Sequence, residues 1–100
     1  MLSWLFGSRS KTIQAYREKN AKVIDVRTAR EFGQGHAQGS INIPLDQLAG
    51  KMKSLKKDEH YLLCCASGMR SSRATDQMKG HGFIHVYNAG AWTNLKSRKS

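Results

Sequence analysis

Short apolar runs alternate with segments of helical spacing along this 100-residue chain, and that alternation limits the possible folds most strongly. Runs too short for helices predict buried strands at 23–26, 41–43, 61–64 and 83–87. Helical patterns occupy 10–20, 28–33, 45–55 and 71–79. The alternation predicts an α/β domain whose parallel sheet is covered by helices on both faces, with right-handed crossovers between strands.

Capping signals mark the beginning of two of these helices. Ser10 is placed to cap the first helix, which should end near Asn20. Thr28 is followed three residues later by Glu31, which is the pattern of a capping box. Gly33 then stops a helix of one or two turns.

Length and charge restrict the organisation of the chain. One hundred residues are the usual size of one compact domain and too few for two cores. The net charge of +10 attracts anions, nucleic acid or anionic lipid without choosing among them. Because the basic residues are scattered and no nucleic-acid signature is present, we expect a solvated surface and no nucleic-acid partner. We divide the chain into an N-terminal extension (1–9), a domain (10–95) and a basic tail (96–100).

The two cysteines and the N-terminus bear on location. Cys64 and Cys65 are adjacent, so they cannot form a disulfide framework and are badly placed to bridge each other. Free thiols fit a reducing compartment. The apolar residues 1–7 are too few for a signal peptide or a membrane span, and we favour their packing on the domain, or disorder, over an interfacial anchor. We therefore expect a cytoplasmic protein without stable membrane insertion.

A compact loop, Cys65 to Ser71, follows the third expected strand and precedes a helix. Its backbone N–H groups should converge, the helix adds the positive end of its dipole, and Gly68 permits a conformation that other residues resist. Arg70 adds a permanent charge suited to an oxyanion. A thiol here should have a pKa below its free value of about 8.5, which makes Cys65 the candidate nucleophile. The residues expected to bind the substrate are Ala66, Ser67, Gly68, Met69, Arg70 and Ser71.

Adjacent cysteines make two loop lengths possible. Counting from Cys64 leaves five residues before Arg70, the spacing of cysteine-dependent phosphatases, whereas counting from Cys65 leaves four and a smaller pocket. Phosphatase loops of that pattern have a glycine three positions after the nucleophile, and Gly68 lies three after Cys65. The spacing therefore favours Cys65, and we assign Cys64 to packing, with a resolving thiol as the less favoured alternative.

Four stretches between about Ser10 and Leu95 resemble the rhodanese-like domain family. They are 23–27 followed by Glu31-Phe32, then 36–44, the loop 65–71, and 88–92. The resemblance implies a mostly parallel five-stranded α/β domain with no metal or organic cofactor. It also implies that Cys65 takes sulfur from a donor such as thiosulfate, holds it as a persulfide and passes it to cyanide or a thiol.

The same resemblance suggests supporting residues. In the family pattern His36 belongs to the turn before the second strand, where it holds loops together. Asp25 and Arg27, at the end of a buried strand, should brace neighbouring loops through charge-assisted hydrogen bonds. Ala66 stands where the family usually has a basic or aromatic residue, which leaves the mouth of the pocket more open. The other histidines lack the spacing with the cysteines that would suggest zinc.

Three functions remain open at the level of sequence. The favoured one is a sulfurtransferase acting on a small anionic donor such as thiosulfate, with a thiol, a protein or cyanide as acceptor. The second is a non-catalytic sulfur carrier, sensor or protein-binding module. The third, least favoured, is a small phosphatase or arsenate reductase built on Cys64.

Overall fold

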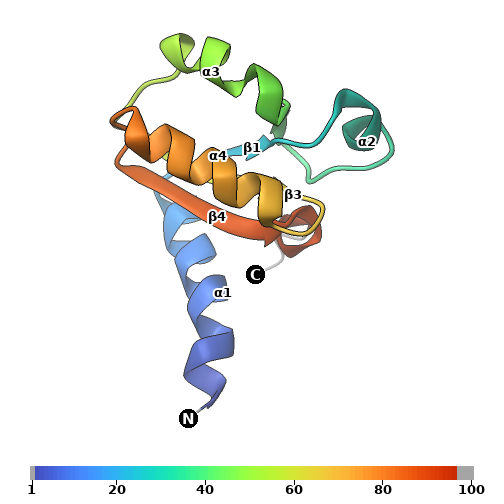
Figure 1. Ribbon diagram of the computed structural model, residues 1–100. Helices are drawn as coiled ribbons and strands as arrows, with labels where there is room; N and C mark the ends of the chain where they lie inside the picture. The colour runs from blue at the N-terminus through green and yellow to red at the C-terminus, as the bar shows by residue number, and fades with distance from the viewer. Residues whose placement is uncertain (1, 97–100) are drawn as a thin grey trace.

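The computed structural model describes residues 2–96, with side chains from Ser8 onward. The strands are β1 (Lys22–Asp25), β2 (Ile41–Asn42), β3 (His60–Cys65) and β4 (His85–Ala91). They form one sheet in the order β2-β1-β3-β4, and every neighbouring pair is parallel. The α/β architecture with a parallel sheet, visible in Figure 1, is as predicted.

The expected number of strands was one too many. Among the described residues the sheet has four strands instead of five. The residues before β1 form a helix, and the chain after β4 turns into a short 3₁₀ helix, so neither flank supplies another strand.

Helices occupy the connections between strands. They are α1 (Leu2–Glu18), α2 (Ala29–Gly33), α3 (Leu48–Lys51) and α4 (Met69–Gly80), with 3₁₀ turns η1 (Leu45–Gln47), η2 (Met52–Ser54) and η3 (Trp92–Leu95). The single helix expected over 45–55 is thus divided, because i→i+3 hydrogen bonds tighten both of its ends. No helix among residues 2–96 combines the length and apolar character needed to cross a membrane.

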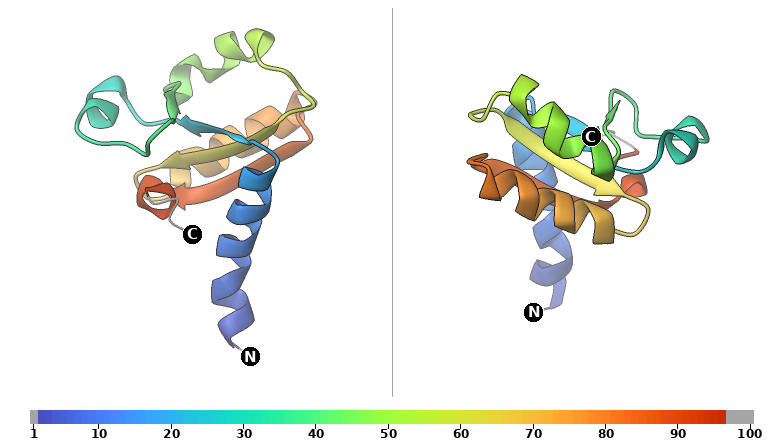
Figure 2. Two further views of the ribbon diagram at one scale, coloured as in Figure 1. Left: turned by 180° about the vertical axis from the view of Figure 1, so that it is seen from behind. Right: turned by 45° about the horizontal axis from the view of Figure 1, so that its top comes forward.

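The first helix begins earlier than predicted. Ser10 lies inside α1 and is not its N-cap, and the helix crosses the expected boundary between residues 9 and 10. The backbone of residues 2–9 forms the first turns of α1, which stand away from the sheet in both views of Figure 2. Met1 and most of the expected basic tail, residues 97–100, lie outside the described residues.

Two apolar clusters cover the two faces of the sheet. On one face, residues of β1, β3 and β4 pack with α3 and α4, including Leu48 and Met78. On the other, Ile13 of α1 and Leu95 of η3 pack against the sheet. Side chains alternate along β3, so the two adjacent cysteines enter different clusters: Cys64 packs with Ile13, whereas Cys65 packs with the residues facing α4.

Candidate active site

Cys65 is the last residue of β3, at the carboxyl edge of the sheet, and not the first residue of the loop as expected. Its side chain is buried, and its sulfur is surrounded by hydrogen-bond donors. The N–H of Gly68 lies 2.9 Å from Sγ and the N–H of Ser71 lies 3.4 Å away. The Ser71 hydroxyl is 3.3 Å from the same sulfur. The loop therefore closes around the thiol.

These contacts separate the acidities of the two thiols. Burial of Cys65 raises its pKa, but hydrogen bonds from Ser71, Gly68 and Ser67 outweigh burial and hold the pKa below the usual 9.0. Burial raises the pKa of Cys64 to about 12, and the Asp25 carboxylate adds to that rise. Because the thiolate is the reacting form, the geometry favours Cys65 as the nucleophile.

Alkylation should therefore distinguish the two cysteines. In the folded protein, iodoacetamide should label Cys65 before Cys64 between about pH 6 and about pH 9, because Cys64 stays a neutral thiol throughout that range. Peptide mass mapping at each pH measures the order. Denatured protein, in which both thiols are exposed, should be labelled equally at both positions. Faster labelling of Cys64 in the folded protein would contradict the assignment.

Gly68 shapes the loop through its backbone. It is the N-cap of α4 with φ of +103°, a conformation that residues with a Cβ rarely adopt. A methyl group at this position would also lie 3.2 Å from Gly90 Cα. Gly68 thus lies close to β4 where α4 begins, and its N–H donates to the sulfur.

Asn88 is a positioning residue that the sequence analysis missed. Its Oδ1 accepts hydrogen bonds from the Ser71 hydroxyl at 2.7 Å and from the Gly90 N–H at 2.9 Å, and its Nδ2 donates to the Gly68 carbonyl at 3.1 Å. A β-bulge makes this possible, because β4 continues past Tyr87 with Ala89 as an extra residue opposite β3. The available signal was its place in the stretch 88–92, which carries part of the family resemblance, two residues before Gly90.

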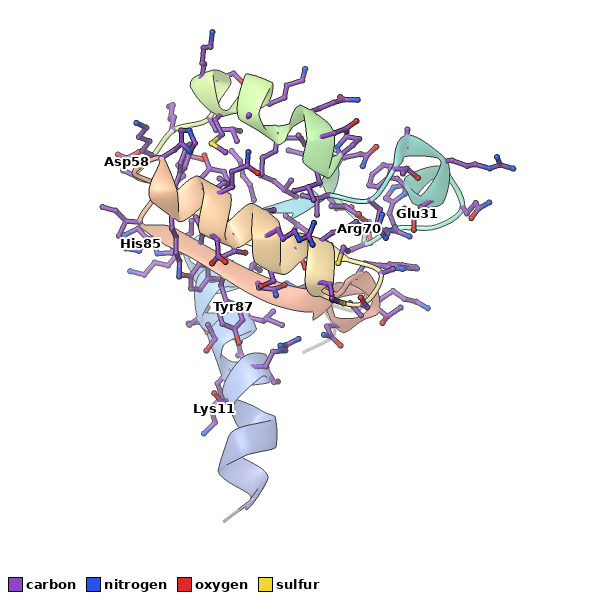
Figure 3. The ribbon with its side chains drawn as sticks, in the orientation of Figure 1. Lys11, Glu31, Asp58, Arg70, His85 and Tyr87 are labelled. Atoms are coloured by element: carbon purple, nitrogen blue, oxygen red, sulfur yellow. The ribbon has the colours of Figure 1, made fainter. Side chains whose placement is uncertain are left out.

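Arg70 is paired with Glu31, for which the sequence had indicated only the capping box and a place in the family resemblance. Arg70 Nη1 lies 2.7 Å from Glu31 Oε1, and Nη2 lies 3.0 Å from Oε2. Figure 3 shows these two side chains meeting between the start of α4 and α2. The predicted capping box is also present, with Glu31 N–H donating to Thr28 Oγ1 at 3.1 Å. Glu31 thus connects α2 to the loop 65–71.

This ion pair should appear in the acid dependence of stability. The hydrogen bond from Arg70 lowers the pKa of Glu31 from 4.5 to about 2. The contribution of the ionised carboxylate is complete above about pH 4.5 and is lost as the pH falls toward 2. Glu31→Gln can keep the capping box but loses the charge. Urea unfolding should show a difference between wild type and variant that shrinks on acidification; a constant difference would contradict the pairing.

Asp25 and Arg27 form a second ion pair, which is buried. Arg27 Nη2 lies 2.8 Å from Asp25 Oδ2 and donates to the Gly35 carbonyl at 2.7 Å. The guanidinium also lies over the Trp92 ring, 4.8 Å from its centroid. These contacts connect the loop after β1 with the turn before β2 and with η3.

Residues 8–97 match the family model described as Rhodanese-like domain. The chain belongs to the rhodanese-like domain family. It is 32% identical over 78 residues to the thiosulfate sulfurtransferase PspE of Escherichia coli, covering 76% of this chain and 75% of that one. A solved structure, a rhodanese with anions from E. coli, shares 31% identity with a TM-score of 0.70, covering 75% of this chain and 91% of that one.

Other relatives in the rhodanese-like family are longer. The uncharacterized protein YqhL of Bacillus subtilis is 37% identical over 70 residues, which are 70% of this chain and 56% of YqhL. The protein HIGH ARSENIC CONTENT 1 of Arabidopsis thaliana is 31% identical over 99 residues, and the match covers 83% of this chain and 59% of that protein. The chain thus spans little more than half the length of these two relatives.

In this rhodanese-like domain the predicted site residues separate into distinct groups. Gly68 and Ser71 contact the Cys65 sulfur. The side chains of Ala66, Ser67 and Met69 are exposed around it. His36 is exposed, and its ring stacks on Phe32 while Nδ1 lies 2.8 Å from the Phe32 carbonyl oxygen. Within residues 2–96, no histidine, cysteine and carboxylate side chains gather in a group that could hold a metal ion.

Proposed function

We propose that this rhodanese-like domain is a sulfurtransferase that moves a sulfane sulfur from thiosulfate, or a similar donor, to a thiol or cyanide through a persulfide on Cys65. The observation that carries the proposal is the ring of donors around Sγ, which includes two backbone N–H groups. Relatives named thiosulfate sulfurtransferase, among them PspE of E. coli and GlpE of Shewanella oneidensis, support it.

The reaction divides into two half-reactions at one sulfur. The Cys65 thiolate attacks the outer sulfur of thiosulfate, the bond between the two thiosulfate sulfurs breaks, and sulfite leaves with the bonding electron pair. A nucleophilic acceptor then attacks the outer sulfur of the persulfide and releases the Cys65 thiolate. A covalent intermediate of this kind gives ping-pong kinetics.

The loop supplies the electrostatic part of this scheme. Before reaction the Gly68 and Ser71 N–H groups stabilise the thiolate, and after transfer they can bind the negative persulfide in the same space. The dipole of α4, which begins at Met69, favours negative charge at this end. Arg70 adds a positive charge that Glu31 largely compensates, so the main donors to the reacting sulfur are backbone groups.

Intact mass spectrometry tests the proposal directly. Protein treated with thiosulfate should gain the mass of one sulfur atom per chain, and added cyanide should remove it and yield thiocyanate. Absence of the added sulfur would refute the transfer. Slow turnover beside stoichiometric loading would instead indicate a carrier. Hydrolysis of an aryl phosphate should be undetectable, because Cys64 lies on the other face of the sheet with its pKa raised to about 12.

A further inference from the structure

An exposed apolar side chain stands beside the buried nucleophile. Cys65 has 0% of its surface exposed, whereas Met69, the first residue of α4 directly after Gly68, is 74% exposed. Ala66 and Ser67, also exposed, carry only small side chains. Among the described side chains only two other large hydrophobic residues are strongly exposed, Ile41 and Ile84. The outer surface of the loop therefore offers one prominent apolar contact and no bulky obstacle.

A cation adjoins this apolar contact. Arg73 lies four residues after Met69 on α4, which places both on one side of the helix, one turn apart. Arg73 is exposed, and no carboxylate among the described side chains lies within ion-pair distance of it. Ala66, Ser67, Met69 and Arg73 together form what we call the loop surface.

The charge of the molecule indicates which partner suits this surface. The chain has 17 lysines and arginines against 7 aspartates and glutamates. Three of those acids, Asp25, Glu31 and Glu59, are already in ion pairs. Complementary charge increases the rate of encounter and selects among partners. An acidic partner is therefore favoured over a basic one.

We propose that the sulfur acceptor is a protein thiol, presented on an acidic segment whose apolar residue contacts Met69 while its carboxylates approach Arg73. The inference rests on the sulfur transfer proposed above and specifies its acceptor. Small acceptors such as cyanide gain nothing from either side chain. In the transfer the acceptor thiolate attacks the outer sulfur of the Cys65 persulfide, the sulfur–sulfur bond breaks, the Cys65 thiolate leaves, and the acceptor becomes the persulfide.

Single-turnover transfer from the persulfide-loaded protein tests the inference. Three acceptors are compared: a peptide with one cysteine flanked by leucine and glutamates, the same peptide with lysines for glutamates, and cyanide. The acidic peptide should react about tenfold faster than the basic one at low salt, and the preference should shrink as salt is added. Arg73→Glu should reduce the preference for the acidic peptide, and Met69→Ser should lower the rate with the acidic peptide relative to the rate with cyanide.

Two matched substitutions control for general effects of charge and polarity. Ile84→Ser removes an apolar side chain with 71% exposure, close to that of Met69. Lys53→Glu reverses an exposed charge in η2, ahead of the amino end of β3. Ile84 precedes the amino end of β4 and Lys53 precedes that of β3, whereas Cys65 lies at the carboxyl end of β3. Figure 3 shows His85, the neighbour of Ile84, far from Arg70. Neither should change the choice of peptide.

The outcomes separate the two proposals. If thiosulfate loads Cys65 and cyanide unloads it, but both peptides react equally and Arg73→Glu changes nothing, the inference is wrong and the proposed function stands. If thiosulfate loads no sulfur, the proposed function fails and the inference fails with it. If Lys53→Glu changes the peptide preference as much as Arg73→Glu does, the preference comes from the overall charge of the protein and the inference is wrong.

Discussion

Serine in place of Cys65 should abolish persulfide formation and lower thiosulfate-to-cyanide turnover by about 10³-fold or more, because a hydroxyl cannot carry the sulfur. The change is nearly isosteric, and the loop donors remain in place. Turnover is measured as thiocyanate formed, and loading is measured by intact mass.

Cys64→Ala is the matched control. Cys64 packs with Ile13, Leu62 and Ala89 and makes no contact with the nucleophile loop's donors in the described residues. Its loss should leave turnover within about twofold of wild type and lower the free energy of unfolding by about 1 kcal/mol, the cost of a small cavity. Turnover that survives in Cys65→Ser, or that disappears in Cys64→Ala with the fold intact, would show that Cys65 is not the nucleophile.

Methionine in place of Arg27 should lower the free energy of unfolding by about 3–5 kcal/mol, because it leaves the Asp25 carboxylate buried without its partner. Asp25 has 0% of its surface exposed and accepts from Arg27 Nη2 at 2.8 Å and from Nε at 3.0 Å. Urea unfolding followed by circular dichroism measures the loss.

Two further variants make that result specific. Adding Asp25→Asn to Arg27→Met removes the unpaired charge, while the amide oxygen can still accept from the Arg27-position N–H, so part of the stability should return. The exposed pair Lys22–Glu59, with side chains 48% and 34% exposed, provides the comparison. Lys22→Met should cost about 0.5 kcal/mol or less. Equal losses at Arg27 and Lys22 would contradict the role of burial.

The parts of the fold that were predictable depend on neighbours in sequence. The runs around Ile24 and Leu63 are apolar on both faces, so they could be read as buried strands, and the capping box of Thr28 and Glu31 spans one helical turn. The apolar run 61–64 and the position of Gly68 also assigned Cys64 to packing, and its side chain lies in the core cluster with Ile13. Local patterns of this kind are visible in a sequence because their physical causes are local.

The parts that escaped prediction depend on distant residues or on competing signals. Arg70 and Glu31 are 39 residues apart, and Asn88 lies 17 residues after Ser71, so only the folded sheet brings each pair together. Ser10 is a residue type that often caps helices, but a favourable cap does not stop a helix that is already continuing from Leu2. The fifth strand came from the resemblance, and no run of residues in the sequence had predicted it.

The alternation of Cys64 and Cys65 across the sheet also determines how a loaded sulfur can be lost. A thiol that reached the persulfide of its neighbour could displace hydrosulfide and close a disulfide. Here the two side chains enter separate apolar clusters on opposite faces, with the strand backbone between them. In the proposed transfer, Cys64 is therefore not placed to displace the sulfur on Cys65, and that sulfur should leave toward a molecule that arrives from outside.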